Sequence, residues 1–469
     1  MSRALHCIAP RAGTPARRAP FPLSVRRHRG QALVLCLVLL FVGCLGLFFM
    51  FSTGRIAASR QRLDNAADAA AYSAALWRAR VMNFHAYSNR AIVAEEVAIA
   101  QAVTLVSWAR YFETFSANAS VLATPFPPVA TVLAAAADLA RGNALVVEEA
   151  ASEEIAARNA YKQLLATSQE VLQHAVDTFA LGAVANEVAR ANDRRFFAFA
   201  LPEDGEFTRM TRRYAAHERE RLQGVVDASL DTFVAGPRGL DMTMVLMPSA
   251  CFGNPFAGVD TWFHVLRKRG GTVMSPRFER WEAADTMSLH GYWPEDGFFG
   301  FEGCFDWEAL PLGWGAAEAG RDVPTGALQA DPGGVLENWS AASAAQAAMN
   351  GRNLPGFAAY SGTPEVRDLA YDTLADPRFP VSRVAVLARV GGDDVRTANV
   401  LDVGVGRLRL GENYAGRKLW SLSAAELYFR RPGGESARTE YASLFNPYWQ
   451  VRLVEPSAAQ RVLADGYVR

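Results

Sequence analysis

The strongest hydrophobic feature of the chain is an uncharged run near its N-terminus. Ala32 to Phe51 reads ALVLCLVLLFVGCLGLFFMF, twenty residues without a charged side chain. As a helix this run would rise about 30 Å, the thickness of the hydrocarbon core of a bilayer. Buried helices of soluble proteins are usually shorter and amphipathic, so the pattern predicts a transmembrane helix over residues 30–52.

A cleaved secretory signal is the alternative interpretation of a basic segment followed by an apolar one. The apolar part of such a signal is usually about 7–15 residues long and ends in a small-x-small site. Here Phe48, Phe49, Met50 and Phe51 stand where small residues would be needed. The pattern therefore favours a retained anchor.

The charges on the two sides of the run predict its orientation. Residues 1–29 contain seven arginines and no acid, whereas the segment after the run mixes Arg55 and Arg60 with Asp64 and Asp68. Because basic residues are retained on the cytoplasmic side, we expect residues 1–29 to form a cytoplasmic tail and the bulk of the chain to lie outside.

A long helix is predicted beyond the membrane, because the chain has no proline from Ser52 to about Asn118 and is rich in alanine. Apolar residues recur there at alternating steps of four and three residues, as in one stripe along a helix. This stripe consists of Leu63, Ala67, Ala70, Ala74, Trp77, Val81 and Phe84. Two interpretations stay open, namely packing within the chain and contact with a helix of another subunit.

The segment PFPP from Pro125 to Pro128 interrupts this helix. A further helical pattern follows from about Val129 to Ala200 and continues more weakly to about Phe233. Its expected apolar face consists of Tyr161, Leu164, Leu165, Ser168, Val171, Leu172, Ala175 and Phe179. We therefore expect a helical region over residues 53–235.

After Gly236 the pattern changes to short alternating stretches separated by turn residues. Trp449, Val451 and Leu453 alternate with polar residues, as in a half-buried strand. Leu408 and Leu410 alternate with arginines in the same way. Residues 236–469 are therefore expected to form a β-rich domain.

The Gly- and aromatic-rich stretch from Phe299 to Trp314 shows little periodicity, and we expect a long ordered loop there. The whole pattern predicts an α+β protein. In it, an N-terminal transmembrane helix continues into a long helical region, which is followed by a β-rich C-terminal domain.

The charge and the cysteines narrow the functional classes. The formal net charge is zero, but without the basic tail 41 basic residues face 48 acidic ones, which argues against a nucleic-acid partner. Cys7, Cys36 and Cys44 lie in the tail and the span, where free thiols are expected. Cys251 and Cys304 lie outside, where an oxidising compartment favours a disulfide between them.

No constellation in the sequence predicts catalysis, a cofactor or a metal. There is no G-x-S-x-G motif, and the seven histidines are scattered. The glycines of DVGVGRLRLG lack the spacing of a dinucleotide-binding loop. Glu295 with Asp296, and Asp306 with Glu308, could form a glycosidase-like pair, but the turn-rich surroundings favour solvated loop carboxylates. We therefore expect a protein that is not an enzyme.

Two segments together resemble a known family. RGQALVLCLVLLFVG (Arg29–Gly43) followed by RLDNAADAAAYSAA (Arg62–Ala75) is similar to the N-terminal region of the TadE/TadG-like proteins of Flp, or tight-adherence, pilus assembly. YSNRAIVAEEVAIAQ (Tyr87–Gln101) and LFNPYWQVRLV (Leu444–Val454) also look like parts of larger members.

The resemblance implies a single-pass protein of the bacterial inner membrane with a periplasmic bulk. Such a protein would help to initiate, anchor or stabilise a pilus of the type IV class, which serves cell adhesion. The implied partners are the membrane and other pilus-assembly or pilin-like subunits. The N-terminal helix could pair with another copy or another subunit.

Two departures from the family limit what the resemblance implies. Processed pilins usually carry a Glu five residues after the cleaved Gly, but Leu35 stands five residues after Gly30, so we expect no cleavage. Some larger members have a metal site of the D-x-S-x-S type. The candidate strand LDMTMVLMPSA (Leu240–Ala250) has no such cluster, so no metal is expected.

A function of a different class is a membrane-tethered periplasmic module that binds carbohydrate or peptide. Its aromatic surface would consist of Trp281, Tyr292, Trp293, Phe298, Phe299 and Trp307. Exposed aromatic side chains would favour this binding module, whereas buried ones would favour a structural component.

Overall fold

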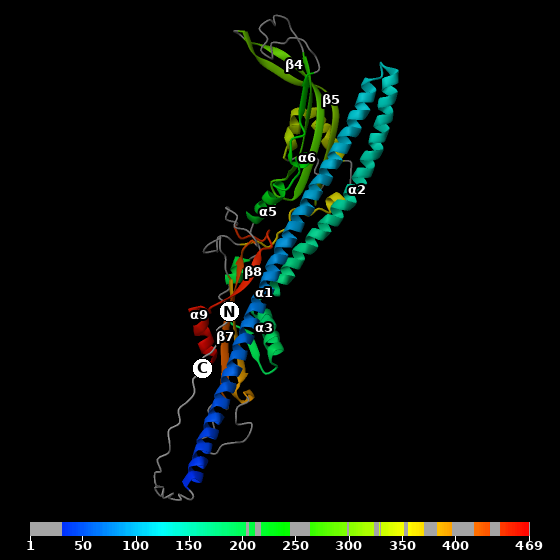
Figure 1. Ribbon diagram of the computed structural model, residues 1–469. Helices are drawn as coiled ribbons and strands as arrows, with labels where there is room; N and C mark the ends of the chain where they lie inside the picture. Colours follow the sequence, from blue (N-terminus) through cyan, green and yellow to red (C-terminus); the bar gives the residue numbers. More distant parts are fainter. Residues whose placement is uncertain are drawn as a thin grey trace, which may run out of the picture. The chain divides into compact units, whose positions relative to one another are not determined.

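The computed structural model describes residues 31–202, 206–211, 217–243, 263–297, 300–322, 328, 330–350, 355–369, 382–395, 417–431 and 441–468. Figure 1 shows long helices followed by a strand-rich region, which confirms the predicted α+β class. Residues 62–390 and 419–469 form one compact unit. The helices described below lie in this unit, apart from residues 31–61 of α1.

The helices are α1 (Gln31–Leu122), α2 (Pro127–His174), α3 (Thr178–Asn192), α4 (Glu206–Met210), α5 (His217–Asp227), α6 (Thr232–Ala235), α7 (Trp339–Asn350), α8 (Pro355–Ala358) and α9 (Ala458–Val468). The strands are β1 (Phe197–Ala200), β2 (Leu240–Thr243), β3 (Phe263–Met274), β4 (Arg280–Gly297), β5 (Gly300–Gly320), β6 (Ser382–Gly391), β7 (Lys418–Phe429) and β8 (Trp449–Val454). Two 3-10 segments are η2 (Pro332–Asn338) and η4 (Gly392–Asp394).

The long helix α1 follows from the proline-free sequence. It contains the uncharged run, whose large side chains are mostly exposed, for example Leu33 at 69% and Met50 at 74%. It ends at Leu122, just before the predicted PFPP interruption. Helix α2 then begins at Pro127, where a residue without an N–H group fits the first turn.

The strands form two four-stranded sheets, with the orders β1-β6-β7-β8 and β2-β3-β4-β5. The predicted strand around Trp449 is confirmed as β8, which pairs antiparallel with β7. The predicted strand at Leu408 and Leu410 lies outside the described residues. Residues 197–200, expected to be helical, instead form β1, which pairs with β6 of the C-terminal region. A strand from the helical half thus completes a sheet of the other half.

The expected loop over residues 299–314 is wrong, because residues 300–314 belong to strand β5. This strand pairs antiparallel with β4 over most of its length. Its glycines mimic a loop signal, but Gly313 and Gly315 serve contact with α1: a Cβ atom on Gly315 would overlap the backbone of Ser107 and Tyr111. Glycine therefore allows a strand to approach a helix backbone closely here.

Helix α1 provides the core for both sheets. One buried cluster joins Ile99 and Val103 of α1 to Trp281 and Ala317 of the β2–β5 sheet. A second cluster joins Met82 of α1 to strands β7 and β8. Residues on the two sides of Gly236 therefore share common cores.

Candidate interaction surface on helix α2

The face that α2 buries contains polar and charged residues as well as apolar ones. Its buried residues are Ala140, Ala144, Glu148, Ala151, Ile155, Asn159, Lys162 and Gln169. The apolar face expected from the sequence is divided: Leu165 and Leu172 pack on buried clusters. Tyr161, Leu164 and Val171 are instead 46%, 62% and 64% exposed. Polar side chains take the inner positions because each finds a partner inside the protein.

Lys162 forms a fully buried ion pair with Glu96. Its Nζ atom lies 2.5 Å from Glu96 Oε1 of α1, and both side chains are inaccessible to solvent. The other Glu96 oxygen accepts hydrogen bonds from the Tyr360 hydroxyl at 2.8 Å and the Trp281 indole N–H at 3.1 Å. Burial lowers the pKa of Lys162, and the neighbouring Glu96 opposes that shift. The carboxylate is therefore fully paired, as a buried charge requires.

The remaining buried polar residues of α2 bind partners in α1 and near α8. Glu148 pairs with Arg110 of α1. Asn159 donates to the Ala359 carbonyl at 2.7 Å, and Gln169 donates to Asn89 Oδ1 at 2.6 Å. These bonds fix the rotation of α2 on α1, and so decide which face points outward.

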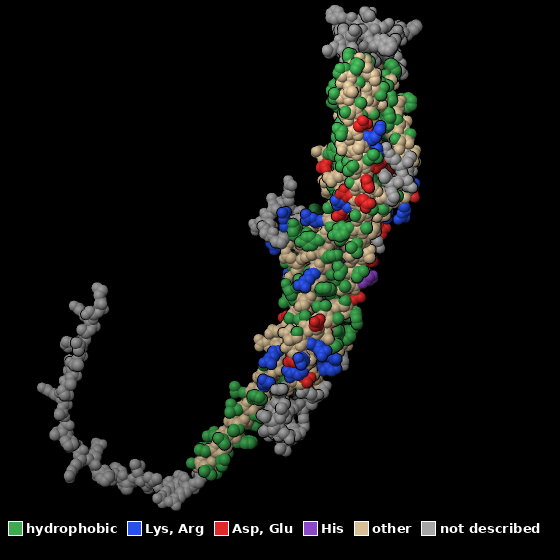
Figure 2. All heavy atoms as spheres, turned by 90° about the vertical axis from the view of Figure 1, so that its right-hand side faces the viewer, with side chains coloured by type: hydrophobic (Ala, Val, Ile, Leu, Met, Phe, Trp, Pro, Cys, Tyr) green, Lys and Arg blue, Asp and Glu red, His purple; other side chains and the backbone are tan. Residues whose placement is uncertain are grey.

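The outward face of α2 carries large apolar side chains. Val132, Leu139 and Val146 recur every seven residues and are 69%, 71% and 66% exposed. Leu164 and Val171 repeat the seven-residue step further along the helix. Figure 2, which looks onto this side of the unit, shows hydrophobic side chains over its upper part.

These residues form part of one seam, which we call the outer seam. It runs in alternating steps of three and four through Val129, Val132, Ala136, Leu139, Asn143, Val146, Ala150, Glu153, Ala157, Ala160, Leu164, Thr167 and Val171. All of them are exposed except Ala136, which is half-buried. A 3.5-residue repeat is the pattern by which two long helices pair. Sequence reasoning missed the seam because many of its positions are alanine, although the spacing of Val132, Leu139 and Val146 signals it.

The middle of the outer seam is acidic. Glu149 and Glu153 are exposed there, one turn apart. They line a groove of about 550 Å³ together with Leu145, Ser152 and Gly356. The face therefore combines an apolar stripe with negative charge at its centre.

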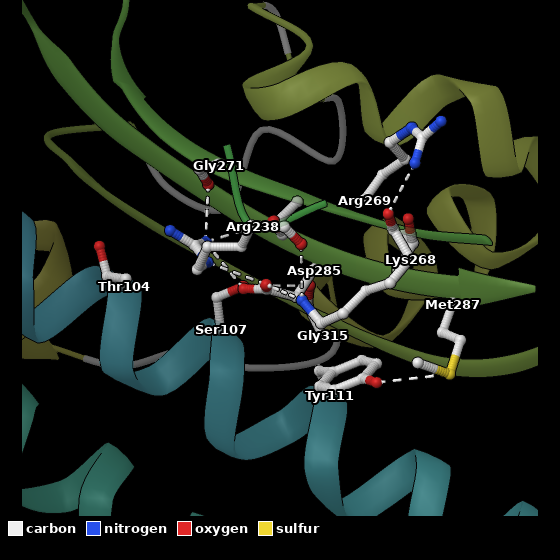
Figure 3. A network of polar contacts seen from close by, with 12 residues as sticks. Thr104, Ser107, Tyr111, Arg238, Lys268, Arg269, Gly271, Asp285, Met287 and Gly315 are labelled. Atoms are coloured by element: carbon white, nitrogen blue, oxygen red, sulfur yellow. Dashed lines mark hydrogen bonds and ion pairs between the residues drawn. The ribbon is translucent and has the colours of Figure 1, made fainter. Parts of the chain in front are cut away.

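A second polar network holds the β2–β5 sheet against α1 (Figure 3). Asp285 is inaccessible to solvent and accepts from Arg238 at 2.8 Å, from Lys268 at 2.9 Å and from the Ser107 hydroxyl at 2.9 Å. Burial and the Asp285 charge raise the pKa of Tyr111 far above its usual value. Two cations on one carboxylate give a structural clamp rather than a reactive group.

The predicted stripe on α1 faces the interior of the protein over most of its length. Leu63, Ala67, Ala70, Ala74 and Val81 are buried, and Trp77 and Phe84 are half-buried. The Trp77 indole N–H donates to the Ala175 carbonyl at 2.8 Å, so this part of the stripe faces the chain's own α2–α3 connection.

The other predicted groups have mixed outcomes. Cys251 and the side chain of Cys304 lie outside the described residues, as do Gly404 and Gly406. Asp306 and Glu308 are not loop carboxylates, since both lie in β5; Asp306 is exposed and Glu308 is half-buried. Asp306 pairs with Arg267 at 2.7 Å, and Glu308 accepts from the backbone N–H of Ser340 at 2.6 Å, at the start of α7.

The predicted aromatic surface is not assembled as expected. Trp281 is fully buried and engaged with Glu96, so it cannot contribute to a ligand surface. Trp307 is 37% exposed. Phe298, Phe299 and the side chains of Tyr292 and Trp293 lie outside the described residues. The burial of Trp281 is the outcome expected for a structural component, and the exposure of Trp307 is the one expected for the binding module.

Two properties of the described residues bear on function. By length and composition, α1 and α2 could each cross a membrane; none of the apolar window of α1 is buried, and 11% of that of α2 is. Among the same residues, no group of three His, Cys, Asp or Glu side chains could hold a metal ion.

Residues 30–79 match the family described as putative Flp pilus-assembly TadE/G-like. This match confirms the resemblance of the N-terminal motifs and supports a pilus-assembly role. The matched segment holds the apolar run and the first buried turns of α1, about a tenth of the chain. No curated protein and no solved structure matches the chain.

Proposed function

We propose that this chain is a structural component of Flp-type pilus assembly in the bacterial inner membrane. Its N-terminal apolar run is the anchor, its bulk is periplasmic, and the outer seam of α2 docks a helix of another assembly subunit. The observation that carries this proposal is that α2 exposes large aliphatic side chains along one face while paired polar residues on its inner face fix its rotation.

The exposed aliphatic side chains are costly unless a partner covers them. Burying a Val or Leu side chain is worth about 1.5–3 kcal/mol, so the six Val and Leu residues of the seam represent a substantial driving force. Contiguous exposed apolar patches on a protein mark interaction sites. The paired polar residues of the inner face prevent α2 from rotating to hide this surface.

A helix with basic residues fits this surface better than lipid or a second copy of α2. Glu153 in the seam and Glu149 beside it are exposed, and carboxylates are expensive in the hydrocarbon core. Self-pairing about Ala150, the middle of the seam, would bring these carboxylates together in either orientation. A partner helix with Lys or Arg beside its apolar stripe would instead pair with them.

Substitutions on the seam test the proposed docking. We expect Leu139→Lys and Leu164→Lys to leave protein level and melting temperature unchanged, because both side chains are exposed, yet to abolish piliation. Ala134→Lys, at an exposed position outside the seam, is the matched control and should preserve pili. Normal piliation of the Leu139→Lys/Leu164→Lys double variant would exclude the seam as a docking surface.

Photo-crosslinking from position 139 or 164 identifies the occupant. The expected product is a covalent complex with a pilus-assembly subunit whose crosslinked peptide is helical and contains Lys or Arg. A product of twice the chain mass would indicate a second copy, and a lipid adduct would indicate membrane contact. Either result would overturn the proposed partner.

The anchor and its orientation are tested by fusions to alkaline phosphatase, which is active only outside the cytoplasm. A fusion after Ala75 should be active and a fusion before Arg26 inactive, since seven arginines precede the apolar run. The reverse pattern would end the proposal of a periplasmic bulk.

A further inference from the structure

Exposed arginines gather at one end of the compact unit, around the turn between α3 and β1. This group, which we call the basic patch, consists of Arg62, Arg190, Arg194, Arg195 and Arg389. All are exposed except Arg389, which is half-buried. Figure 2 shows Lys and Arg side chains concentrated at the lower end of the unit, where Figure 1 places α3.

The α3–β1 turn is bridged by hydrogen bonds, and its acid, Asp193, is paired with an arginine. Asp193 accepts three bonds from Arg195: from the backbone N–H at 3.0 Å, from Nε at 2.9 Å and from Nη2 at 2.6 Å. These hydrogen bonds lower the pKa of Asp193 to about 2, and Arg62 of α1 adds a smaller electrostatic contribution. Asp193 therefore remains ionised, and its charge offsets that of Arg195.

Aromatic rings accompany the arginines. The Arg389 guanidinium lies 4.8 Å from the centre of the Phe197 ring and 5.7 Å from that of Trp420. Phe197 is 41% exposed. Arginine and tryptophan are residues that proteins place at the headgroup level of a bilayer, and Phe197 adds an exposed apolar ring beside them.

Chain length keeps the patch near the membrane. Arg62 follows Phe51, the last residue of the apolar run, by eleven residues. A helix rises about 16 Å over eleven residues. Headgroups extend several ångströms beyond the hydrocarbon core, so Arg62 would lie about one Debye length from them. Asp193 lies within electrostatic reach of Arg62, so the turn is held at the same level.

We infer that the basic patch binds the anionic phospholipid headgroups of the membrane in which the chain is anchored. This inference rests on the proposed anchor, but on residues other than the outer seam. Arginines contribute bidentate donors to phosphate oxygens, and an anionic surface attracts basic residues within a Debye length. Bound headgroups would fix the tilt of the compact unit and hence the direction in which the outer seam faces.

The test uses full-length protein in two kinds of nanodisc. One is made of phosphatidylcholine alone, and the other contains about 30% phosphatidylglycerol, which gives it an anionic surface. Amide hydrogen exchange is measured for residues 190–199. We expect exchange there to slow by about fivefold with the anionic lipid and to recover at 1 M salt, where the Debye length is about 3 Å.

Charge reversal at Arg190 and Arg194 should remove the lipid dependence, because both are exposed. Arg195 is left in place, since it orders the turn through Asp193. The matched control is Arg141→Glu, an exposed arginine of α2, which should retain the lipid dependence. An unchanged melting temperature of Arg190→Glu/Arg194→Glu would show that the fold is intact.

The outcomes are distinguishable. Protein that enters the nanodiscs but exchanges equally in both lipids overturns the inference and leaves the anchor standing. Protein that is not retained in nanodiscs refutes the anchor and the inference together. Lipid dependence that survives the Arg190→Glu/Arg194→Glu double substitution assigns the effect to another surface and also overturns the inference.

Discussion

The ammonium group of Lys162 in α2 lies 2.5 Å from a carboxylate oxygen of Glu96 in α1, and neither side chain is accessible to solvent. This pair lies where the two long helices meet Tyr360 and Trp281. It fixes the rotation of α2, and therefore couples the interior of the protein to the direction of the outer seam.

Breaking the Lys162 and Glu96 pair should strongly destabilise the protein. Lys162→Met leaves the Glu96 carboxylate buried without its cation, so we expect the free energy of unfolding to fall by about 3–5 kcal/mol. The double variant Lys162→Met/Glu96→Gln should recover a large part, because no uncompensated charge remains. Urea denaturation checks both values, and a single-variant loss below about 1 kcal/mol would contradict this account.

His85 makes stability depend on pH. It is buried in α1, its ring Nε2 lies 3.1 Å from Gln173 Oε1, and burial lowers its pKa to about 4. Between about pH 6.5 and pH 4 the unfolded chain binds a proton that the folded chain does not. The free energy of unfolding should therefore decrease as pH falls through this window, by about 3 kcal/mol at pH 4.

The control for this pH dependence is His85→Gln, which keeps a donor for Gln173 but cannot titrate. Thermal unfolding between pH 7 and pH 4.5 should show a smaller decrease for this variant than for the parent protein. Equal slopes would assign the pH dependence to other groups.

The helices could be predicted from the sequence where one physical rule dominates. The absence of proline gives α1, and the proline pair at Pro127 and Pro128 gives the start of α2. The orientation of α2 could not be predicted, because an apolar-face rule assumes that apolar residues point inward. Lys162 and Gln169 point inward instead, since α1 supplies Glu96 and Asn89 as partners from distant positions.

Strand β5 and the basic patch escaped prediction for a related reason. Gly313 and Gly315 of β5 are needed because α1, which is distant in sequence, packs directly against them. The arginines of the patch are separated by up to 327 residues, and only the adjacent Arg194 and Arg195 leave a local signal. Contacts between distant positions decide both features.

Trp77 tests the predicted stripe on α1. It is half-buried, donates to the Ala175 carbonyl at 2.8 Å and packs on the cluster around Met82. We expect Trp77→Ala to cost about 2–3 kcal/mol, less than the about 3–5 kcal/mol of a fully buried Trp, and to lower protein accumulation. Trp77→Phe keeps the ring and should cost about 1 kcal/mol through the lost hydrogen bond. Normal accumulation of Trp77→Ala with lost piliation would instead place a partner helix on the stripe.

Gly315 tests how closely β5 approaches α1. A Cβ atom at this position would meet the Ser107 carbonyl and the Tyr111 backbone N–H group, neither of which can move without shifting the helix. Gly315→Ala should therefore destabilise by about 1–3 kcal/mol or more, as overpacking does. The matched control is Gly142→Ala in α2, where no atom lies within 4 Å of the added Cβ. There alanine should stabilise by about 0.5–1 kcal/mol, because it replaces a glycine inside a helix. Melting curves of the two variants should shift in opposite directions, and a shift of Gly315→Ala toward higher temperature would show that sheet and helix are not in contact.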